Sequence, residues 1–279
     1  MAQASLLEAP ELAAERIDAR ASGENFPVVS LLAPRWARPH LRAIYGFARL
    51  VDNLGDEAEG DRPALLDELD RELEGPPRTE IMRRVHATID ECGLGLEPFA
   101  RLIEANRIDQ VKSRYATWEE VREYCTYSAD PVGRLVLGVY ERAGDSEAVA
   151  LSDSVCTGLQ LVNFIQDPPR DLALGRVYLP LEDLKRFAVR EEDLAGPHKP
   201  EIAALLAFEA ARARELLGAG LPLRRMLGGR AGMSVALYAR GGLSALDALE
   251  RANWDVFSGR PAPSRLTFAR LALQELFRR

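Results

Sequence analysis

Cysteine and histidine are scarce in this 279-residue chain, which has three of each. The cysteines are widely spaced and form no CxxC pair: Cys92, Cys125 and Cys156. That spacing argues against a zinc site and against a disulfide framework, and it is typical of a reducing compartment. The histidines share no spacing that indicates a metal site or a catalytic triad, so we expect surface or capping roles for His40, His86 and His198.

Long apolar runs are missing as well, since the longest falls far short of the ~20 residues that span a bilayer. The segment Met1 to Pro10 lacks the basic region and apolar core of a secretory signal. The net charge is -7 and no block of five basic residues occurs, so no nucleic-acid partner is expected. We expect a cytoplasmic protein. An acidic chain can still bind diphosphates when bridging cations reverse the local charge.

Period-2 runs of Val, Ile and Thr are nearly absent. Ala, Leu, Glu and Arg instead recur at three- and four-residue spacing, and Gly and Pro separate the periodic segments. The sequence therefore predicts an all-α protein in which residues 1–279 form one domain. The predicted helices are 8–20, 37–59, 62–74, 78–92, 97–109, 117–128, 131–143, 146–173, 199–220, 231–257 and 264–278.

The predicted helix that contains Leu41 to Glu57 has an apolar stripe that ends in two carboxylates. At about 100° per residue, one face carries Leu41, Tyr45, Ala48, Asp52 and Asp56. The two acids are four residues apart and repel each other unless something neutralises them. Either the helix leaves the core here and the acids are solvated, or both acids line a cavity and hold a divalent cation.

The segment Leu151 to Leu172 is apolar over most of its circumference. Its narrow polar stripe consists of Gln160, Asn163, Asp167 and Asp171. A helix that is apolar on most sides is usually buried, and a buried polar stripe needs partners or a water-filled cavity. Two such helices facing each other would form a carboxylate box. Oxygen ligands without His or Cys favour Mg²⁺ or Mn²⁺ over zinc, so the second stripe favours the metal interpretation of the first.

Cationic and hydroxyl side chains lie close to both stripes in the sequence. Arg49 precedes Asp52 by one turn, while Arg176 and Tyr178 follow the second stripe. These side chains could donate hydrogen bonds to phosphate oxygens. For Arg49 the alternative is a simple ion pair with Asp52 or a contact with Asn53.

These segments resemble the squalene and phytoene synthase family. AIYGFARLVDNLGDE (43–57) resembles the family's first aspartate motif, and LQLVNFIQDPPRDLALGRVYLP (159–180) resembles its second. YCTYSADPVG (124–133) is similar to the family's mid-chain substrate-contacting segment. GENFPVVSLLAPRWARPHLRAIYGFAR (23–49) resembles the N-terminal signature of the bacterial hydroxysqualene synthase branch. The order and spacing of these segments match over nearly the whole chain.

The resemblance implies an α-helical isoprenoid synthase bundle around a central cavity, with both aspartate motifs at its mouth. The implied metal ligands are Asp52, Asp56, Asn163, Asp167 and Asp171. Residues implied to lie near the diphosphates are Arg49, Gln160, Arg176 and Tyr178, and those implied to lie beside prenyl chains are Phe26, Tyr45, Tyr124 and Gly133. The candidate catalytic residues are the four aspartates and Tyr178.

Two positions depart from the family pattern. Position 53 is Asn where the family usually has Asp, and we expect metal binding to persist because Asp52 and Asp56 are kept. Pro168 and Pro169 follow Asp167 directly, and a proline inside a helix removes a hydrogen bond and crowds the preceding turn. The sequence therefore predicts a kink or local widening at 164–169 that displaces Asp171 from the line of Asn163 and Asp167.

For the branch it resembles most, the resemblance implies that presqualene diphosphate ionises, rearranges and is captured by water to give hydroxysqualene. Water replaces hydride in that reaction, so we expect Mg²⁺ or Mn²⁺ but no NADPH. The alternatives are a head-to-head farnesyl transferase that makes presqualene diphosphate, squalene or phytoene, and a non-catalytic isoprenoid-binding protein. Other enzymes of the hopanoid pathway are implied partners. The amphipathic helix 264–278 either docks on the domain or contacts a membrane surface.

Overall fold

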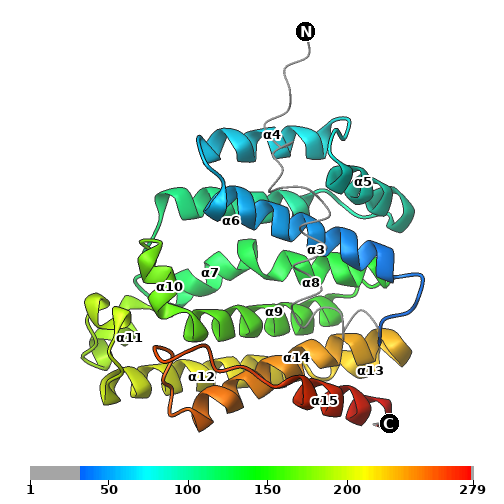
Figure 1. Cartoon of the computed structure of the whole chain (residues 1–279). Helices are drawn as coiled ribbons and strands as arrows, with labels where there is room; N and C mark the ends of the chain where they lie inside the picture. Colours follow the sequence, from blue (N-terminus) through cyan, green and yellow to red (C-terminus); the bar gives the residue numbers. More distant parts are fainter. Residues whose placement is uncertain (1–31, 278–279) are drawn as a thin grey trace.

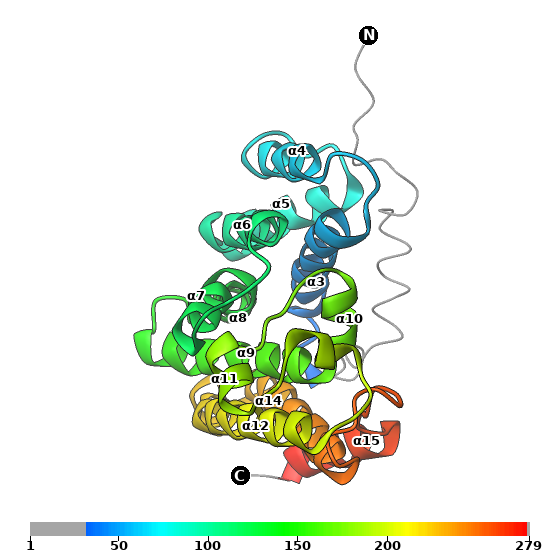
Figure 2. The same cartoon turned by 90° about the vertical axis from the view of Figure 1, so that its left-hand side faces the viewer.

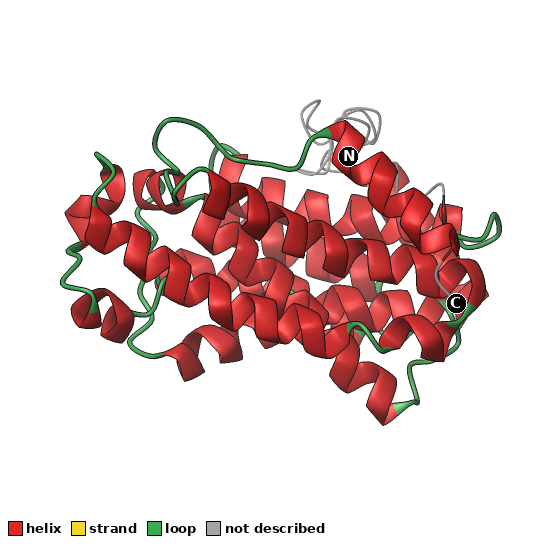
Figure 3. Cartoon of the chain, turned by 90° about the horizontal axis from the view of Figure 1, so that it is seen from below, coloured by secondary structure: helices red, strands yellow, loops and turns green. Residues whose placement is uncertain are grey.

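The computed structural model describes residues 32–277, which form the stacked helices of Figure 1. No strand occurs within this range (Figure 3), and the one extended pairing in it is an isolated bridge between Arg114 and Val177. The all-α prediction is therefore confirmed. The predicted helix 8–20 and the candidate residue Phe26 lie outside the described residues.

The helix boundaries agree with the predicted ones over most of the described chain. The first half forms α3 (Arg38–Asp52), the π-helical turn η3 (Asn53–Glu57), α4 (Arg62–Glu74), α5 (Glu80–Cys92), α6 (Glu97–Val111), α7 (Trp118–Ser128) and α8 (Asp130–Val139). The second half forms α9 (Ser146–Gln166), α10 (Pro168–Ala173), α11 (Leu181–Arg186), the 3-10 helix η4 (Glu191–Ala195), α12 (Pro200–Gly220), α13 (Leu223–Leu227), α14 (Gly229–Arg251) and α15 (Arg265–Phe277). The sequence prediction lacks α11, η4 and α13, and it extends α8 and α14 too far.

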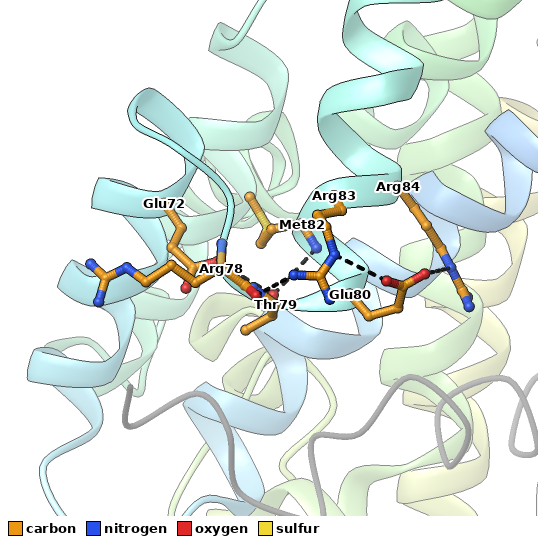
Figure 4. Close-up of polar contacts among 7 residues, drawn as sticks. All are labelled: Glu72, Arg78, Thr79, Glu80, Met82, Arg83 and Arg84. Carbon is orange, nitrogen blue, oxygen red and sulfur yellow. Dashed lines mark hydrogen bonds and ion pairs between the residues drawn. The ribbon is translucent and has the colours of Figure 1, made fainter. Parts of the chain in front are cut away.

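The start of α5 shows how polar side chains fix a helix end in this fold. The Thr79 hydroxyl accepts a hydrogen bond from the backbone N–H of Met82 at 3.3 Å, as an N-cap residue does. The buried carboxylate of Glu72, near the end of α4, accepts from the backbone N–H groups of Arg78 and Thr79 (Figure 4). The bond to Met82 satisfies a donor that the first turn of a helix leaves unpaired, and the bonds to Glu72 hold the residues just before α5 against the end of α4.

Two clusters of buried apolar side chains form the interior. The first joins α3, α4, α5, α6 and α8 and includes Phe47, Leu66 and Phe99. The second joins α7, α9, α11, α12 and α14 and includes Ile165 and Leu206. Helix α9 packs against α8 on one side and against α12 and α14 on the other, so it lies in the middle of the bundle (Figures 1 and 2).

Among the described helices, α9 alone is long and apolar enough to cross a bilayer. Half of its most apolar window is buried inside the protein, and its neighbours α8 and α12 cover it on both sides. The central helix of a globular bundle has the same length and composition. The apolar character of α9 is therefore accounted for by its position in the core.

Candidate active site

A cavity of about 980 Å³ lies where α3, α6, α8, α9 and α14 meet. This volume is at the upper end of the range for small-molecule sites. Apolar side chains such as Leu41, Val136 and Val235 line much of the wall. Most of the polar side chains come from the carboxyl ends of α3, α6 and α9 and from the segment that follows α9, and Arg260 comes from the loop between α14 and α15. Because α3 and α9 both run towards α10, their polar ends meet at one end of the cavity (Figure 1).

The first acidic motif lies where α3 changes into the π-helical turn η3. The backbone N–H of Ala58 donates to the carbonyl of Asn53 at 2.8 Å, which closes the wider turn. Gly55 allows this turn to approach α6, since a Cβ at position 55 would lie 2.0 Å from the amide oxygen of Asn106. The widened turn brings Asp52 and Asp56 to the cavity wall.

The charge of Asp56 acts on the neighbouring Asp52. The Asp52 side chain is 56% exposed and lines the wall of the cavity. Burial in this wall, together with the charge of Asp56, raises the pKa of Asp52 to about 6. Arg49, whose Nη1 lies 3.9 Å from an Asp52 oxygen, opposes this rise.

The second acidic motif is split between two helices, as the Pro168-Pro169 pair predicts. Helix α9 ends at Gln166, Asp167 has φ -116° and ψ 23°, and α10 begins at Pro168. The predicted break at 164–169 is confirmed, whereas the single predicted helix 146–173 is wrong. The reason is that both prolines lack the N–H that would continue the ladder.

Asp167 and Asp171 remain close in spite of the break. The N–H of Asp171 donates to the carbonyl of Asp167 at 2.9 Å, and both side chains line the cavity. Burial raises the pKa of Asp171 to about 7, and the charge of Asp167 adds to the rise. Burial raises the pKa of Asp167 too, although Arg260 opposes the rise.

Arginines pair with three of these four aspartates. In addition to the contact of Arg49 with Asp52, Arg176 donates to Asp56 at 2.5 Å and Arg260 donates to Asp167 at 2.8 Å. The positions of Arg49 and Arg176 near the aspartates were predicted from the sequence, whereas that of Arg260 was not. No sequence signal identifies Arg260, because it lies 93 positions from Asp167 in a loop between α14 and α15.

Asp109 is a second residue that the sequence analysis misses. Its side chain is 6% exposed, accepts a hydrogen bond from the hydroxyl of Tyr124 at 2.6 Å and lies 4.0 Å from Arg176. Tyr178 lies close enough to Asp109 to lower the pKa of that carboxylate, and its ring stacks on Phe164 with ring centroids 4.3 Å apart. Burial raises the pKa of Asp109 to about 6.

A signal for Asp109 is present in the sequence. Leu102, Ala105 and Asn106 precede it at helical spacing on one face of α6, so the stripe is apolar first and acidic at its end. The stripe that leads to Asp52 has the same form. The same pattern therefore predicts that Asp109 lies beside the first acidic motif.

The other candidate residues take separate positions. Tyr45, Gly133, Gln160 and Asn163 all line the cavity. Gly133 is also a contact point between α8 and α9, since a Cβ there would lie 2.3 Å from the hydroxyl oxygen of Ser152. The hydroxyl of Tyr124 is directed to Asp109 and its ring forms part of the wall.

The donor set fits a hard divalent cation that is shared with an anionic ligand. All donors are oxygens of Asp or Asn on opposite walls of one cavity. Within residues 32–277, no three acidic, His or Cys side chains converge on one point. Mg²⁺ commonly takes one or two carboxylates and completes its octahedron with water and phosphate, so an all-protein cage is not required.

The sequence model of the squalene/phytoene synthase family matches residues 19–267. The chain belongs to this family. The hydroxysqualene synthase of Sinorhizobium fredii is 37% identical over 213 residues, which cover 74% of this chain and 72% of that protein. The 15-cis-phytoene synthase of Synechocystis sp. is 33% identical over 272 residues, which cover 89% of this chain and 80% of that protein.

Among solved structures of the family, squalene synthase HpnC from Alicyclobacillus acidocaldarius is similar to this chain. It has a TM-score of 0.78 and 45% identity, and the match covers 87% of this chain and 93% of that one. These relatives carry three different activity names. Membership of the squalene/phytoene synthase family and a role in isoprenoid biosynthesis are common to them, whereas the individual reaction differs.

Proposed function

We propose that this chain is a magnesium-dependent hydroxysqualene synthase that converts presqualene diphosphate into hydroxysqualene and diphosphate. The observation that carries the proposal is the composition of the cavity. Carboxylates and arginines gather at one end, and apolar side chains line much of the remaining wall. A prenyl diphosphate is divided in the same way, into a charged head and a long hydrocarbon.

In the proposed reaction, Arg49, Arg176 and Arg260 exchange their carboxylate partners for the oxygens of the diphosphate. The four aspartates of the two motifs and Asn163 would hold Mg²⁺, which would supply positive charge to neutralise the departing diphosphate. The cation ligands and the arginines thus hold the leaving group from both walls of the cavity.

The remaining steps take place along the apolar wall. The carbon–oxygen bond breaks and its electron pair leaves with the diphosphate. The rings of Tyr45 and Tyr124 stabilise the resulting carbocation through their faces while it rearranges. Water then adds to the cation and loses a proton, which gives the alcohol. No hydride is consumed, so NADPH is not required.

The similarity to the hydroxysqualene synthase of Sinorhizobium fredii supports this assignment. The second candidate is a head-to-head prenyl transferase that joins two farnesyl diphosphates to presqualene diphosphate or squalene, or two C20 prenyl diphosphates to phytoene. It is favoured by the squalene synthase name of the 45% identical structure and by the phytoene synthase relative. The proposal includes a cytoplasmic location and cooperation with other enzymes of the hopanoid pathway.

The deciding experiment supplies presqualene diphosphate and farnesyl diphosphate separately to the purified chain with Mg²⁺, and analyses the extracted products by mass spectrometry. We expect presqualene diphosphate to give hydroxysqualene and diphosphate without NADPH, and chelation of Mg²⁺ to stop the reaction. Squalene formed only with NADPH, or turnover of farnesyl diphosphate alone, would assign a sister activity. Binding of both substrates without turnover of either would assign a non-catalytic isoprenoid-binding protein.

A further inference from the structure

Helix α15 packs on the bundle with its acidic residue directed inward. The side chain of Glu275 is 0% exposed, and the Nε of Arg224 in α13 lies 2.6 Å from its carboxylate. Arg240 of α14 forms a second ion pair with the same carboxylate. Phe268, on the same face, packs so closely on Gly241 that a Cβ there would lie 3.1 Å from the Phe268 ring. These contacts fix which face of α15 points outward.

The outward face of α15 is apolar. Leu266 is 82% exposed, Leu273 is 56% exposed and Leu276 is 52% exposed. Three of the seven exposed large hydrophobic residues in 32–277 therefore lie on this one helix. At about 100° per residue they fall within an arc of about 80°. Single exposed leucines are ordinary, but a stripe of them opposite a buried glutamate inverts the usual amphipathic pattern and marks an interaction surface.

The charge of this segment is opposite to that of the chain. Residues 265–279 contain four arginines and one acid, Glu275, which gives a net charge of +3 in a chain with a net charge of -7. Glu275 is buried between two arginines, whereas Arg270 is exposed beside the leucines. An apolar stripe beside an exposed arginine, in a segment of positive net charge, is the pattern of helices that lie in the interface of an anionic bilayer.

Helix α15 also lies between this stripe and the cavity. Phe268 on its inner face, with Ala262 and Pro263 just before the helix, lines the cavity. Figures 1 and 2 place α15 at the outer edge of the bundle, beside α14. The apolar interior of the cavity is thus separated from the outward leucines by the thickness of one helix.

We propose that the outward face of α15, formed by Leu266, Leu273, Leu276 and Arg270, docks on the surface of an anionic lipid bilayer. The helix lies parallel to the surface, with its leucines at the boundary between headgroups and acyl chains and its arginine among the anionic headgroups. This inference rests on the geometry and charge of α15 and does not depend on the proposed activity.

The test is flotation of the full chain with vesicles, in the absence of substrate. One set of vesicles is phosphatidylcholine alone, and the other is an equal mixture of phosphatidylcholine and phosphatidylglycerol. We expect binding to the mixed vesicles, little binding to phosphatidylcholine, and a decrease with added salt. The double variant Leu266→Gln/Leu273→Gln should bind the mixed vesicles at least about tenfold more weakly, because two apolar side chains no longer insert.

Two further variants sharpen the test. Arg270→Glu should weaken binding to the anionic vesicles without changing an apolar side chain. Val111→Gln is the matched control, since Val111 is 87% exposed at the end of α6 and lies outside the proposed surface. All four changed side chains are exposed, and unchanged circular dichroism and thermal midpoint verify folding.

The proposal is overturned if the wild-type chain does not float with anionic vesicles, or if the double variant floats as the wild type does. It is also overturned if sedimentation shows a dimer that the double variant dissociates while neither protein binds vesicles. That result would assign the leucine stripe to a second copy of the chain. If the Val111→Gln control loses as much vesicle binding as the double variant, exposed apolar residues act nonspecifically. That result would also reject the outward face of α15 as the docking surface.

Discussion

The hydroxyl of Tyr124 donates a 2.6 Å hydrogen bond to the Asp109 carboxylate oxygen that lies 4.0 Å from Arg176, and Tyr178 lies near the same carboxylate. Asp109 therefore connects a wall of stacked rings with the arginine that pairs with Asp56. A carboxylate in this position orients the side chains that face the ligand, and small errors of orientation can cost about a hundredfold in rate.

We expect Asp109→Asn to lower turnover by roughly 10- to 100-fold, because the amide no longer orients Tyr124 and Arg176 with a negative charge. Burial raises the pKa of Asp109 to about 6, so the group is still largely ionised at pH 7 and its ionisation lowers the stability of the folded state relative to the unfolded state. The variant should therefore be at least as stable as the wild type. Steady-state kinetics and thermal unfolding check both results, and Tyr124→Phe should show a similar loss of rate. Wild-type turnover in both variants would reject the positioning role.

Asp52→Asn and Asp167→Asn should each lower turnover by at least about two orders of magnitude while the fold survives. Each change removes a charged metal ligand and relieves local repulsion without leaving a cavity. Activity at saturating Mg²⁺ and circular dichroism are the measurements. Asp67→Asn is the control, since Asp67 is an exposed partner of Arg107 outside the cavity and its variant should keep the wild-type rate.

Mg²⁺ and inorganic pyrophosphate should stabilise the chain together more than the sum of their separate effects. The carboxylates lie on two walls and do not form a cage in the described residues, so a bridging anion completes the coordination. A ligand that binds only the folded state raises the thermal midpoint. Thermal unfolding with each component alone and with both is the test, and Asp171→Asn should reduce the joint effect. Strictly additive shifts would contradict this coordination.

Glu209 lies outside the candidate site and should make the stability of the folded state depend on pH. It is fully buried in α12, and burial raises its pKa from 4.5 to about 8, although the ion pair with Arg212 at 2.7 Å opposes this rise. The folded state thus holds the proton more tightly than the unfolded state, and stability falls as pH rises from about 4.5 to about 8. Glu209→Gln, which imitates the protonated acid, should raise the thermal midpoint by a few degrees at pH 8 and change it less at pH 5. The exposed Glu215→Gln on the same helix is the control. Equal shifts at both pH values would contradict the assignment.

Gly133→Ala should destabilise the fold by roughly 1–3 kcal/mol, since the new Cβ would meet Ser152 at 2.3 Å and Cys156 at 2.6 Å. Denaturant unfolding measures the change. Gly218→Ala is the matched control, because it also lies in a helix and has no atom within 4 Å of the added Cβ. That variant should be neutral or slightly stabilised. A Gly133→Ala variant as stable as the control would show that α8 and α9 can move apart freely.

The long helices and both acidic motifs could be predicted from the sequence because they depend on local patterns. Apolar residues at helical spacing predicted α3 and α9, and Pro168 and Pro169 predicted the break between α9 and α10. The membership of the chain in the squalene/phytoene synthase family followed from the order and spacing of the motifs. All of these signals lie within short stretches of chain.

The features that the sequence did not predict depend on tertiary contacts. The π-helical turn at 53–57 is a local widening whose cause lies partly in the close approach of Asn106. Arg260 reaches Asp167 from a loop far along the chain. The short helices α11 and α13 have too few residues for a periodic pattern to be visible.

The pairing of arginines with aspartates at the polar end of the cavity has a consequence for the encounter with an anion. A chain with a net charge of -7 repels a polyanion at long range, and that repulsion is screened beyond about 8–10 Å at physiological ionic strength. Inside this distance the anion meets the neutral pairs of Asp52 with Arg49, Asp56 with Arg176 and Asp167 with Arg260. The association rate is therefore set by short-range exchange of partners and not by electrostatic steering.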